Sequence, residues 1–190
     1  MKKTIFVSAA FLLFATAGFS QTWNWDKAHS QLNFGIAHMG ISEIAGSFTG
    51  VTAKITSAKD DLSDAVVELS ADVATISTGN EQRNNHLKSP DFFDAAKFPT
   101  LTFKSTSFKK TSGKNYEVTG DLTLHGVTKP VVLTATFNGT IVNPQSKKTV
   151  GGFKVTGIVK RSDFGIATGM PAGMLGDEVA LNANAEFIKD

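Results

Sequence analysis

The chain has 190 residues, a formal net charge of +2 and no cysteine. That length suits one domain whose core can be stable without cross-links. The absence of cysteine excludes disulfides, thiol catalysis and thiolate metal sites. No run of Lys or Arg is longer than two residues, so we expect no nucleic-acid partner.

The first 20 residues predict a secretory signal peptide. Lys2 and Lys3 form a basic start, an apolar run covers residues 5–17, and residues 18–20 (Gly-Phe-Ser) suit cleavage after Ser20. The run is shorter than the roughly 20 residues that cross a membrane, which leaves an uncut membrane anchor as the weaker alternative. Loss of the two lysines lowers the net charge of the mature domain, residues 21–190, from +2 to zero.

From Trp23 onward, apolar residues alternate with polar or small ones, which is the period of a half-buried β-strand. The alternating segments cover residues 32–38, 48–51, 67–73, 101–103, 118–124, 131–137, 153–159 and 179–187. Eight short strands separated by turn residues, among them His125-Gly126, are typical of an all-β sandwich or barrel. No second set of apolar helices could cover an open sheet. We therefore expect an eight-stranded antiparallel barrel.

Residues 78–101 interrupt this alternation and predict a short helical insert. Thr78 and Glu81 have the spacing of a capping box. A helix that begins there would run to Leu87 and end before Pro90. Ser89-Pro90 then predicts a second short helical turn over residues 91–95. The insert carries four large apolar side chains that need burial: Leu87, Phe92, Phe93 and Phe98.

An eight-stranded barrel is wide enough either to be filled by side chains or to hold one small ligand. Small residues at inward positions favour a cavity, and the candidates are Gly35 or Ala37, Gly120, Gly157, Ala183 and Ala185. Bends and bulges in a filled barrel would explain the same residues, so both interpretations stay open.

A ligand made of hydrocarbon would need an apolar wall, because it gains only about 0.8 kcal/mol per buried methylene. Phenylalanine supplies such a wall without a hydroxyl that needs a partner. The candidate lining residues are Phe34, Ile36, Phe48, Phe92, Phe103, Leu122, Leu124, Val155 and Phe164. Met170 and Met174, in a glycine-rich loop, are candidates for a mobile lid. Ordinary core packing and a permanently closed loop are the alternatives.

A charged head group would need hydrogen-bond donors, and the candidates are Arg161 and His86. Arginine suits phosphate oxygens, although a pair with Asp163 or a turn brace would equally explain Arg161. The four histidines are dispersed, so we expect no metal site. No Gly-x-Ser-x-Gly motif is present. We expect no cofactor, no catalytic residue and no enzymatic activity.

Several motifs, in order from Asp26 to the C-terminus, resemble the YceI-like proteins. They are Asp26-x-x-His29-Ser30, His38-Met-Gly-Ile-Ser42, residues 85–94, Lys97-Phe98-Pro99, residues 119–130, Arg161-Ser-Asp-Phe-Gly165 and Gly176-Asp-Glu-Val179. The resemblance implies a lipocalin-like antiparallel barrel with a helical insert. It also implies binding of a polyisoprenoid or related lipid in the bacterial periplasm. Residues 165–175 depart from the family, which often has a longer loop with an aromatic residue there.

Together these features predict an exported, non-catalytic carrier for a long apolar lipid, such as a polyisoprenoid, an isoprenoid quinone or a polyprenyl phosphate. A fatty acid or fatty amide is the nearest variant. A stress-response or adhesion module that acts through its loops, with a filled barrel, is the alternative of a different class. Transient membrane contact and a homodimer are compatible with either.

Overall fold

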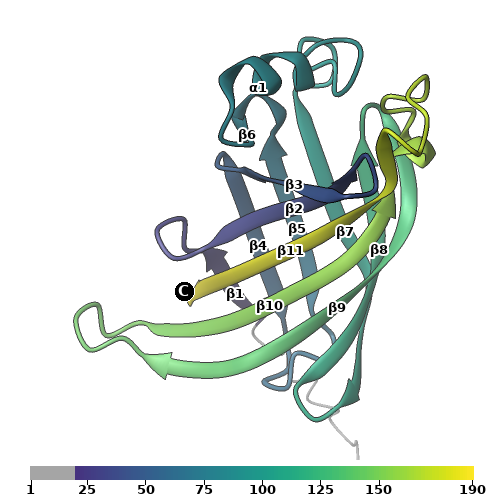
Figure 1. Ribbon diagram of the computed structural model, residues 1–190. Helices are drawn as coiled ribbons and strands as arrows, with labels where there is room; N and C mark the ends of the chain where they lie inside the picture. The colour runs from purple at the N-terminus through teal and green to yellow at the C-terminus, as the bar shows by residue number, and fades with distance from the viewer. Residues whose placement is uncertain (1–19) are drawn as a thin grey trace, which may run out of the picture.

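The computed structural model describes residues 20–190, and residues 1–19, which hold most of the predicted signal peptide, lie outside them. Antiparallel strands curve into a barrel (Figure 1). The strands are β1 (Gln21–Trp25), β2 (Gln31–His38), β3 (Ser42–Phe48), β4 (Val51–Ser57), β5 (Val66–Asp72), β6 (Ile76–Ser77), β7 (Thr100–Ser112), β8 (Asn115–Leu124), β9 (Val127–Val142), β10 (Thr149–Lys160) and β11 (Leu175–Lys189). Among the described residues, the helices are α1 (Glu81–Leu87) and the 3₁₀-helices η1 (Val73–Thr75) and η2 (Arg161–Phe164).

The eleven labelled strands form eight long strands. Each of the first three long strands is interrupted and therefore has two labels: β1 with β2, β3 with β4, and β5 with β6. Both β1 and β2 pair with β11, and the loop between them, residues 26–30, separates the pair Trp25–Phe187 from the pair Gln31–Asn184. In the same way β3 and β4 pair with β2 and β1, and β5 and β6 pair with β4 and β3. Pairing of β1 with β11 closes the barrel. The predicted all-β, eight-stranded antiparallel barrel is confirmed.

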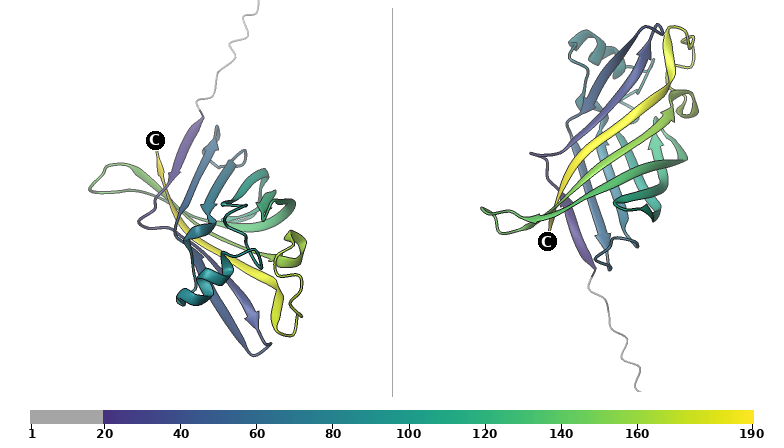
Figure 2. Two further views of the ribbon diagram at one scale, coloured as in Figure 1. Left: turned by 90° about the horizontal axis from the view of Figure 1, so that it is seen from above. Right: turned by 60° about the horizontal axis from the view of Figure 1, so that its bottom comes forward.

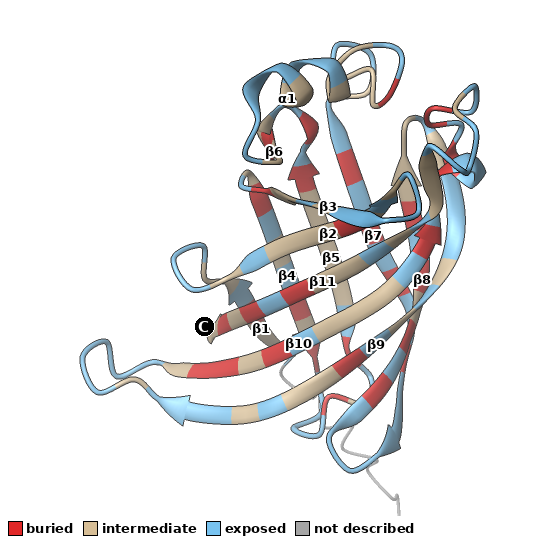
Figure 3. Cartoon of the chain, viewed as in Figure 1, coloured by how far each residue is buried: buried red, intermediate tan, exposed pale blue. Residues whose placement is uncertain are grey.

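Strand alternation places one set of side chains inside the barrel and the other in solvent. Along β7, Leu101 and Phe103 are buried while Thr100, Thr102 and Lys104 are exposed. Figure 3 shows this as red bands alternating with pale blue ones on the strands of the far wall. The period-two pattern of the sequence is therefore the pattern of burial.

The predicted turn at His125-Gly126 is confirmed. It joins β8 to β9, and both residues have positive φ, 51° at His125 and 74° at Gly126. Two left-handed residues form the tight turn whose twist matches that of antiparallel strands. His125 Nδ1 also lies 3.1 Å from the carbonyl oxygen of Phe164, so this histidine connects the turn to η2.

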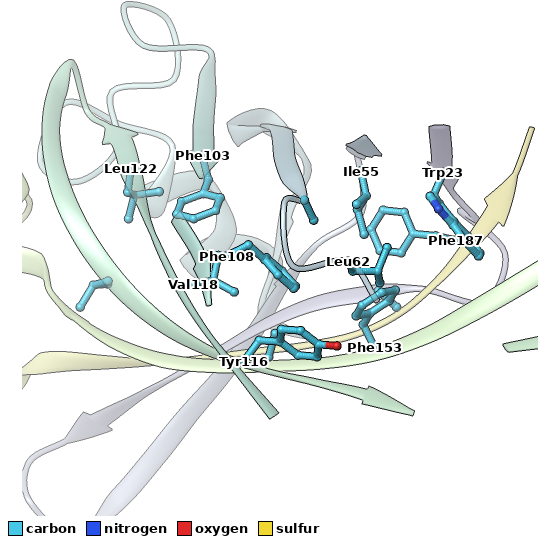
Figure 4. Close-up of a cluster of buried hydrophobic side chains, with 14 of the residues drawn as sticks. Trp23, Ile55, Leu62, Phe103, Phe108, Tyr116, Val118, Leu122, Phe153 and Phe187 are labelled. Carbon is cyan, nitrogen blue, oxygen red and sulfur yellow. The ribbon is translucent and has the colours of Figure 1, made fainter. Parts of the chain in front are cut away.

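One end of the barrel is filled with large side chains. Trp23, Leu62, Phe108, Tyr116, Phe153 and Phe187 pack together there (Figure 4). Leu62 comes from the loop between β4 and β5 and is almost completely buried. The Tyr116 hydroxyl donates a hydrogen bond of 2.9 Å to the carbonyl of Asp61, and burial raises the pKa of Tyr116. The loop is thus fixed beneath the barrel and closes this end.

The opposite end carries the helical insert and the loop between η2 and β11 (Figures 1 and 2). Helix α1 ends at Leu87, as the sequence predicts, but its cap is different. Asn80 Oδ1 accepts a hydrogen bond of 2.9 Å from the Arg83 N–H, so the predicted capping box at Thr78 is wrong. Gly79, with φ of 74°, turns the chain between Thr78 and Asn80 and leaves Thr78 outside the helix.

The second predicted helical turn is replaced by hydrogen-bonded turns. The carbonyl of Ser89 accepts bonds from the N–H groups of Phe92 and Asp94, at 3.1 and 2.9 Å. Asp94 has a positive φ of 47°, which a right-handed helix does not allow. The segment therefore folds back and directs its phenylalanines toward the barrel.

Candidate functional site

A cavity of 460 Å³ lies inside the barrel, between the filled end and the insert. All eight long strands contribute to its wall, together with α1 and the loop before β11. Its volume falls within the range of about 300–1,000 Å³ typical of small-molecule sites. The barrel is therefore hollow in its middle and filled at one end.

Most of the predicted lining residues lie on the cavity wall: Phe34, Ile36, Phe48, Phe92, Phe103, Leu122, Leu124 and Val155, with Met170 and Met174 at the loop. Phe164 does not. It is the last residue of η2, is 1% exposed and packs in the core outside the cavity. Sequence placed it correctly in the interior but not on the wall. Contact between these side chains and a ligand remains a prediction.

Several wall residues were not singled out from the sequence, although they follow the same alternation. Leu32 shares the phase of Phe34 and Ile36, and Leu181 shares the phase of Ala183 and Phe187. The wall also includes Trp25, Leu69, Phe108, Phe153 and Val159. Counting every second residue from the predicted lining residues along each strand would have identified them, because alternate side chains of a strand share a face.

The glycines proposed to leave space for a ligand instead leave space for the protein's own side chains. A Cβ at Gly120 would lie 2.5 Å from the Phe103 ring, and one at Gly157 would lie 2.4 Å from Leu133 Cδ2. Gly35 is on the outer face, beneath the carboxylate of Glu43. Ala183 and Ala185, in contrast, do line the cavity.

Arg161 is buried and holds the loop before β11. Its guanidinium donates to five backbone carbonyls: Gly176 from Nε at 2.9 Å, Ile166 and Ala167 from Nη1 at 3.1 and 2.5 Å, and Met170 and Leu175 from Nη2 at 3.0 and 3.1 Å. These bonds use all five N–H groups of the side chain. The predicted head-group role of Arg161 is not supported, because no donor is left. The side chain is a brace, with backbone carbonyls rather than Asp163 as partners.

Polar residues lie at several places on the cavity wall, namely Asn33, His38, Arg161 and Asn182 on the barrel and three residues of the insert. Arg83 and His86 of α1 both line the cavity, and so does Thr78. His86 was a head-group candidate, and its Nε2 lies 3.2 Å from Asp91 Oδ2 on the exposed side of the insert. The edge of its ring also packs against Phe92, with centroids 4.9 Å apart. The insert thus brings polar groups and phenylalanines together at one end of the cavity.

A second polar cluster lies on the outside of the barrel, where β1 gives way to β2. His29 Nδ1 is 2.8 Å from Asp26 Oδ2, and Glu186 contributes a third potential metal ligand within 4.8 Å. The hydrogen bond to Asp26 raises the pKa of His29, and the same bond lowers the pKa of Asp26. Sequence reasoning missed this cluster because Glu186 is on the last strand. Its neighbours Ala185 and Phe187 line the cavity, so Glu186 points away from it.

Comparisons with known proteins agree with this fold. A UPF0312 protein of Pseudomonas savastanoi pv. phaseolicola is 43% identical over 140 residues, which cover 73% of this chain and 71% of that protein. The crystal structure of a YceI protein of Campylobacter jejuni is 33% identical, with a TM-score of 0.73 over 81% of this chain and 90% of that chain.

A polyisoprenoid binding domain from Saccharophagus degradans, implicated in plant cell wall breakdown, shares the fold at 16% identity. Its TM-score is 0.64 over 88% of this chain and 98% of that chain. Residues 23–187 match the family model of the YceI-like domain. This chain therefore belongs to the YceI-like family.

Proposed function

We propose that this protein is an exported, non-catalytic carrier that holds a long apolar lipid, a polyisoprenoid or an isoprenoid derivative, inside its barrel. The observation that carries the proposal is the 460 Å³ cavity and its wall, which is formed almost entirely by aliphatic and aromatic side chains. Each methylene transferred from water to this wall contributes about 0.8 kcal/mol, so a long chain gains affinity without polar contacts. The name of the Saccharophagus degradans domain of the same fold supports this class of ligand.

The composition of the wall favours binding over catalysis. Within residues 20–190, the residues that line the cavity include two histidines, His38 and His86, but no Ser, Asp, Glu, Lys or Tyr. Hydrolysis by general acid–base or nucleophilic chemistry needs such groups close to one another. The Arg161 guanidinium is also held by carbonyls, as described above.

Export follows from the first 20 residues, which have the pattern of a cleaved signal peptide. We place the mature protein, residues 21–190, in the periplasm, where a water-insoluble lipid needs a carrier between membranes. Its lack of cysteine makes folding independent of the oxidising conditions there.

To take up a lipid, the protein would have to contact a membrane. Three exposed apolar side chains at the open end of the barrel are suited to such contact. Met39 and Ile41, at the tip of the β2–β3 hairpin, are 57% and 86% exposed, and Met174 is 58% exposed. The Met39 N–H donates to the Met174 carbonyl at 3.0 Å, and Met174 also lines the cavity. An apolar surface thus continues from the outside of the molecule into the cavity.

Native mass spectrometry of the mature protein, purified from its own host, tests the proposal, with extraction and identification of any bound lipid. We expect a stoichiometric prenyl lipid. A fatty acid or fatty amide would keep the carrier role and change the cargo. A protein that is reproducibly empty and also refuses added prenyl and acyl lipids would contradict the carrier role.

A further inference from the structure

The cavity explains how a hydrocarbon chain is held but not what lies at its polar end. Helix α1 supplies the groups that bear on this question. Arg83, His86 and Leu87 lie within one turn of α1 and all line the cavity, so this face of the helix faces the cavity. The cationic residue Arg83 is therefore at the boundary between the apolar wall and the insert.

Arg83 and Arg161 both line the cavity, but they differ in their free donors. Arg161 uses all five N–H groups on carbonyls. Arg83 makes two hydrogen bonds, from Nε to Thr78 Oγ1 and from Nη2 to the Thr78 carbonyl, both of 2.8 Å. Among the described residues, both N–H groups of Arg83 Nη1 and one of Nη2 have no protein acceptor.

No carboxylate of residues 20–190 lies within ion-pair distance of Arg83, whereas Asp91 is paired with His86 and Glu68 with Lys54 and Lys104. The Arg83 side chain is half-buried, and its Nη1 is not a buried unpaired atom, so these N–H groups are accessible to a ligand. An anion is the partner that satisfies both its charge and its remaining N–H groups.

The Arg83 side chain is held in place before any ligand binds. The Thr78 hydroxyl that accepts from Nε itself donates to Asn84 Oδ1 at 2.7 Å, and the Thr78 N–H donates to the same oxygen at 2.8 Å. Asn80 fixes the start of α1 through the Arg83 N–H. These bonds fix one edge of the guanidinium and leave Nη1 available, so little rotamer entropy remains to be lost on binding.

We propose that Arg83 binds the anionic head group, a phosphate or a carboxylate, of an amphiphile whose apolar chain fills the barrel. The planar guanidinium presents parallel N–H groups that match two oxygens of such a group. This inference rests on the proposed lipid-carrier function and defines its ligand more narrowly: anionic amphiphiles are preferred over neutral ones of the same chain.

The test compares geranylgeranyl phosphate with geranylgeraniol, which differ only in the head group. The dissociation constants of both are measured for the wild-type mature protein and for Arg83→Gln, Arg83→Lys and Lys97→Gln. Lys97 is the matched control, because it is an exposed cation on the same insert and does not line the cavity.

Wild type and Lys97→Gln should bind the phosphate at least about tenfold more tightly than the alcohol, the effect expected of a hydrogen-bonded charge pair. Arg83→Gln should abolish this preference, because it should weaken binding of the phosphate far more than binding of geranylgeraniol. Arg83→Lys should retain part of it. Excess inorganic phosphate should not displace the lipid phosphate, since a free anion lacks the chain.

Equal wild-type affinities for the two ligands would overturn the inference, and so would an equal loss of both in Arg83→Gln, which would make Arg83 a brace for Thr78. Displacement by inorganic phosphate would also overturn it, in favour of a free-anion site. If the wild type binds neither ligand, the prenyl-lipid cargo of the proposed function itself fails. This outcome is distinguishable from failure of the Arg83 inference alone, in which the wild type binds geranylgeraniol and geranylgeranyl phosphate equally well.

Discussion

The two arginines of this chain have different roles because their hydrogen-bond partners differ. Arg161 is 6% exposed and keeps its charge in the interior by donating to five carbonyls, three in the loop after η2 and two at the start of β11. Those carbonyls would otherwise be without partners, and an unsatisfied buried polar group costs roughly 1–3 kcal/mol. Arg83 shares its donors between Thr78 and the cavity. The role of each arginine therefore follows from how many of its N–H donors are already used by the protein.

A single ion pair also makes the stability of the molecule depend on pH. The hydrogen bond to Asp26 raises the pKa of His29. The stability that the protonated His29 contributes is therefore complete below the ordinary pKa of histidine and is lost as the pH rises through the raised pKa. The pKa of Asp26 is lowered, so the stability that the ionised Asp26 contributes is lost only as the pH falls through this lowered pKa. We predict that His29→Gln lowers Tm more at about pH 5.5 than at about pH 9.

The effect should be small, because His29 is exposed and exposed pairs contribute little. Thermal unfolding followed by circular dichroism at both pH values measures it. Asp26→Asn should reproduce the pH dependence, and the double variant should add nothing to it. An equal loss of Tm at acidic and alkaline pH would show that the pair is not responsible.

At the scale of elements, three segments from different parts of the sequence meet at the open end of the barrel: the insert, the β2–β3 hairpin and the loop before β11 (Figure 1). The hairpin and the loop are joined by the bond from Met39 to Met174. Their exposed apolar residues lie beside the cavity, whereas the closed end is sealed by the β4–β5 loop. The open end therefore offers a path for a lipid, whereas the β4–β5 loop closes the other end.

We predict that Ile41→Ser weakens binding to neutral phosphatidylcholine vesicles by roughly tenfold, since burying an isoleucine is worth about 1.5–3 kcal/mol. Vesicle co-sedimentation measures this. Ile158→Ser is the matched control, because Ile158 is 62% exposed on the outer face of β10 and does not line the cavity. An equal loss in both variants, or no loss in Ile41→Ser, would argue against the hairpin as the membrane contact.

At the scale of the whole molecule, a barrel with eight long strands is large enough to seal one end with aromatic side chains and still leave its middle empty. The hollow depends on small side chains at a few inward positions. Ala183 is one of these, and it lies opposite Val155 on β10 and Leu32 on β2. A larger side chain at this position would occupy the space that we assign to the lipid.

We predict that Ala183→Phe abolishes or severely weakens prenyl-lipid binding, at a cost of about 1–3 kcal/mol in stability from overpacking. Ala180→Phe is the matched control, because Ala180 lies on the same strand but faces solvent. In wild type, affinity should rise about fourfold per added methylene and level off once the cavity is full. Titration calorimetry with a series of chain lengths measures both effects. Unchanged lipid binding in Ala183→Phe would place the lipid elsewhere.

The sequence by itself determined most of the strands, the direction of most side chains and the turn at His125-Gly126. It did not predict β1, and of β3 and β4 it marked only residues 48–51, where these two strands meet. These features are local, because alternate residues of a strand lie on opposite faces whatever the neighbouring strands do. For the same reason Phe34, Val155 and Leu122 could be assigned to the interior without a structure.

Only the tertiary structure decided which interior space is empty. Whether Gly120 leaves a hollow depends on the register between β7 and β8, which places the Phe103 ring over it. Likewise, Phe164 lies off the wall, and Arg161 is occupied while Arg83 retains free donors, because their neighbours come from distant parts of the chain. Such contacts are set by how the strands and loops pack, and no periodicity in the sequence records them.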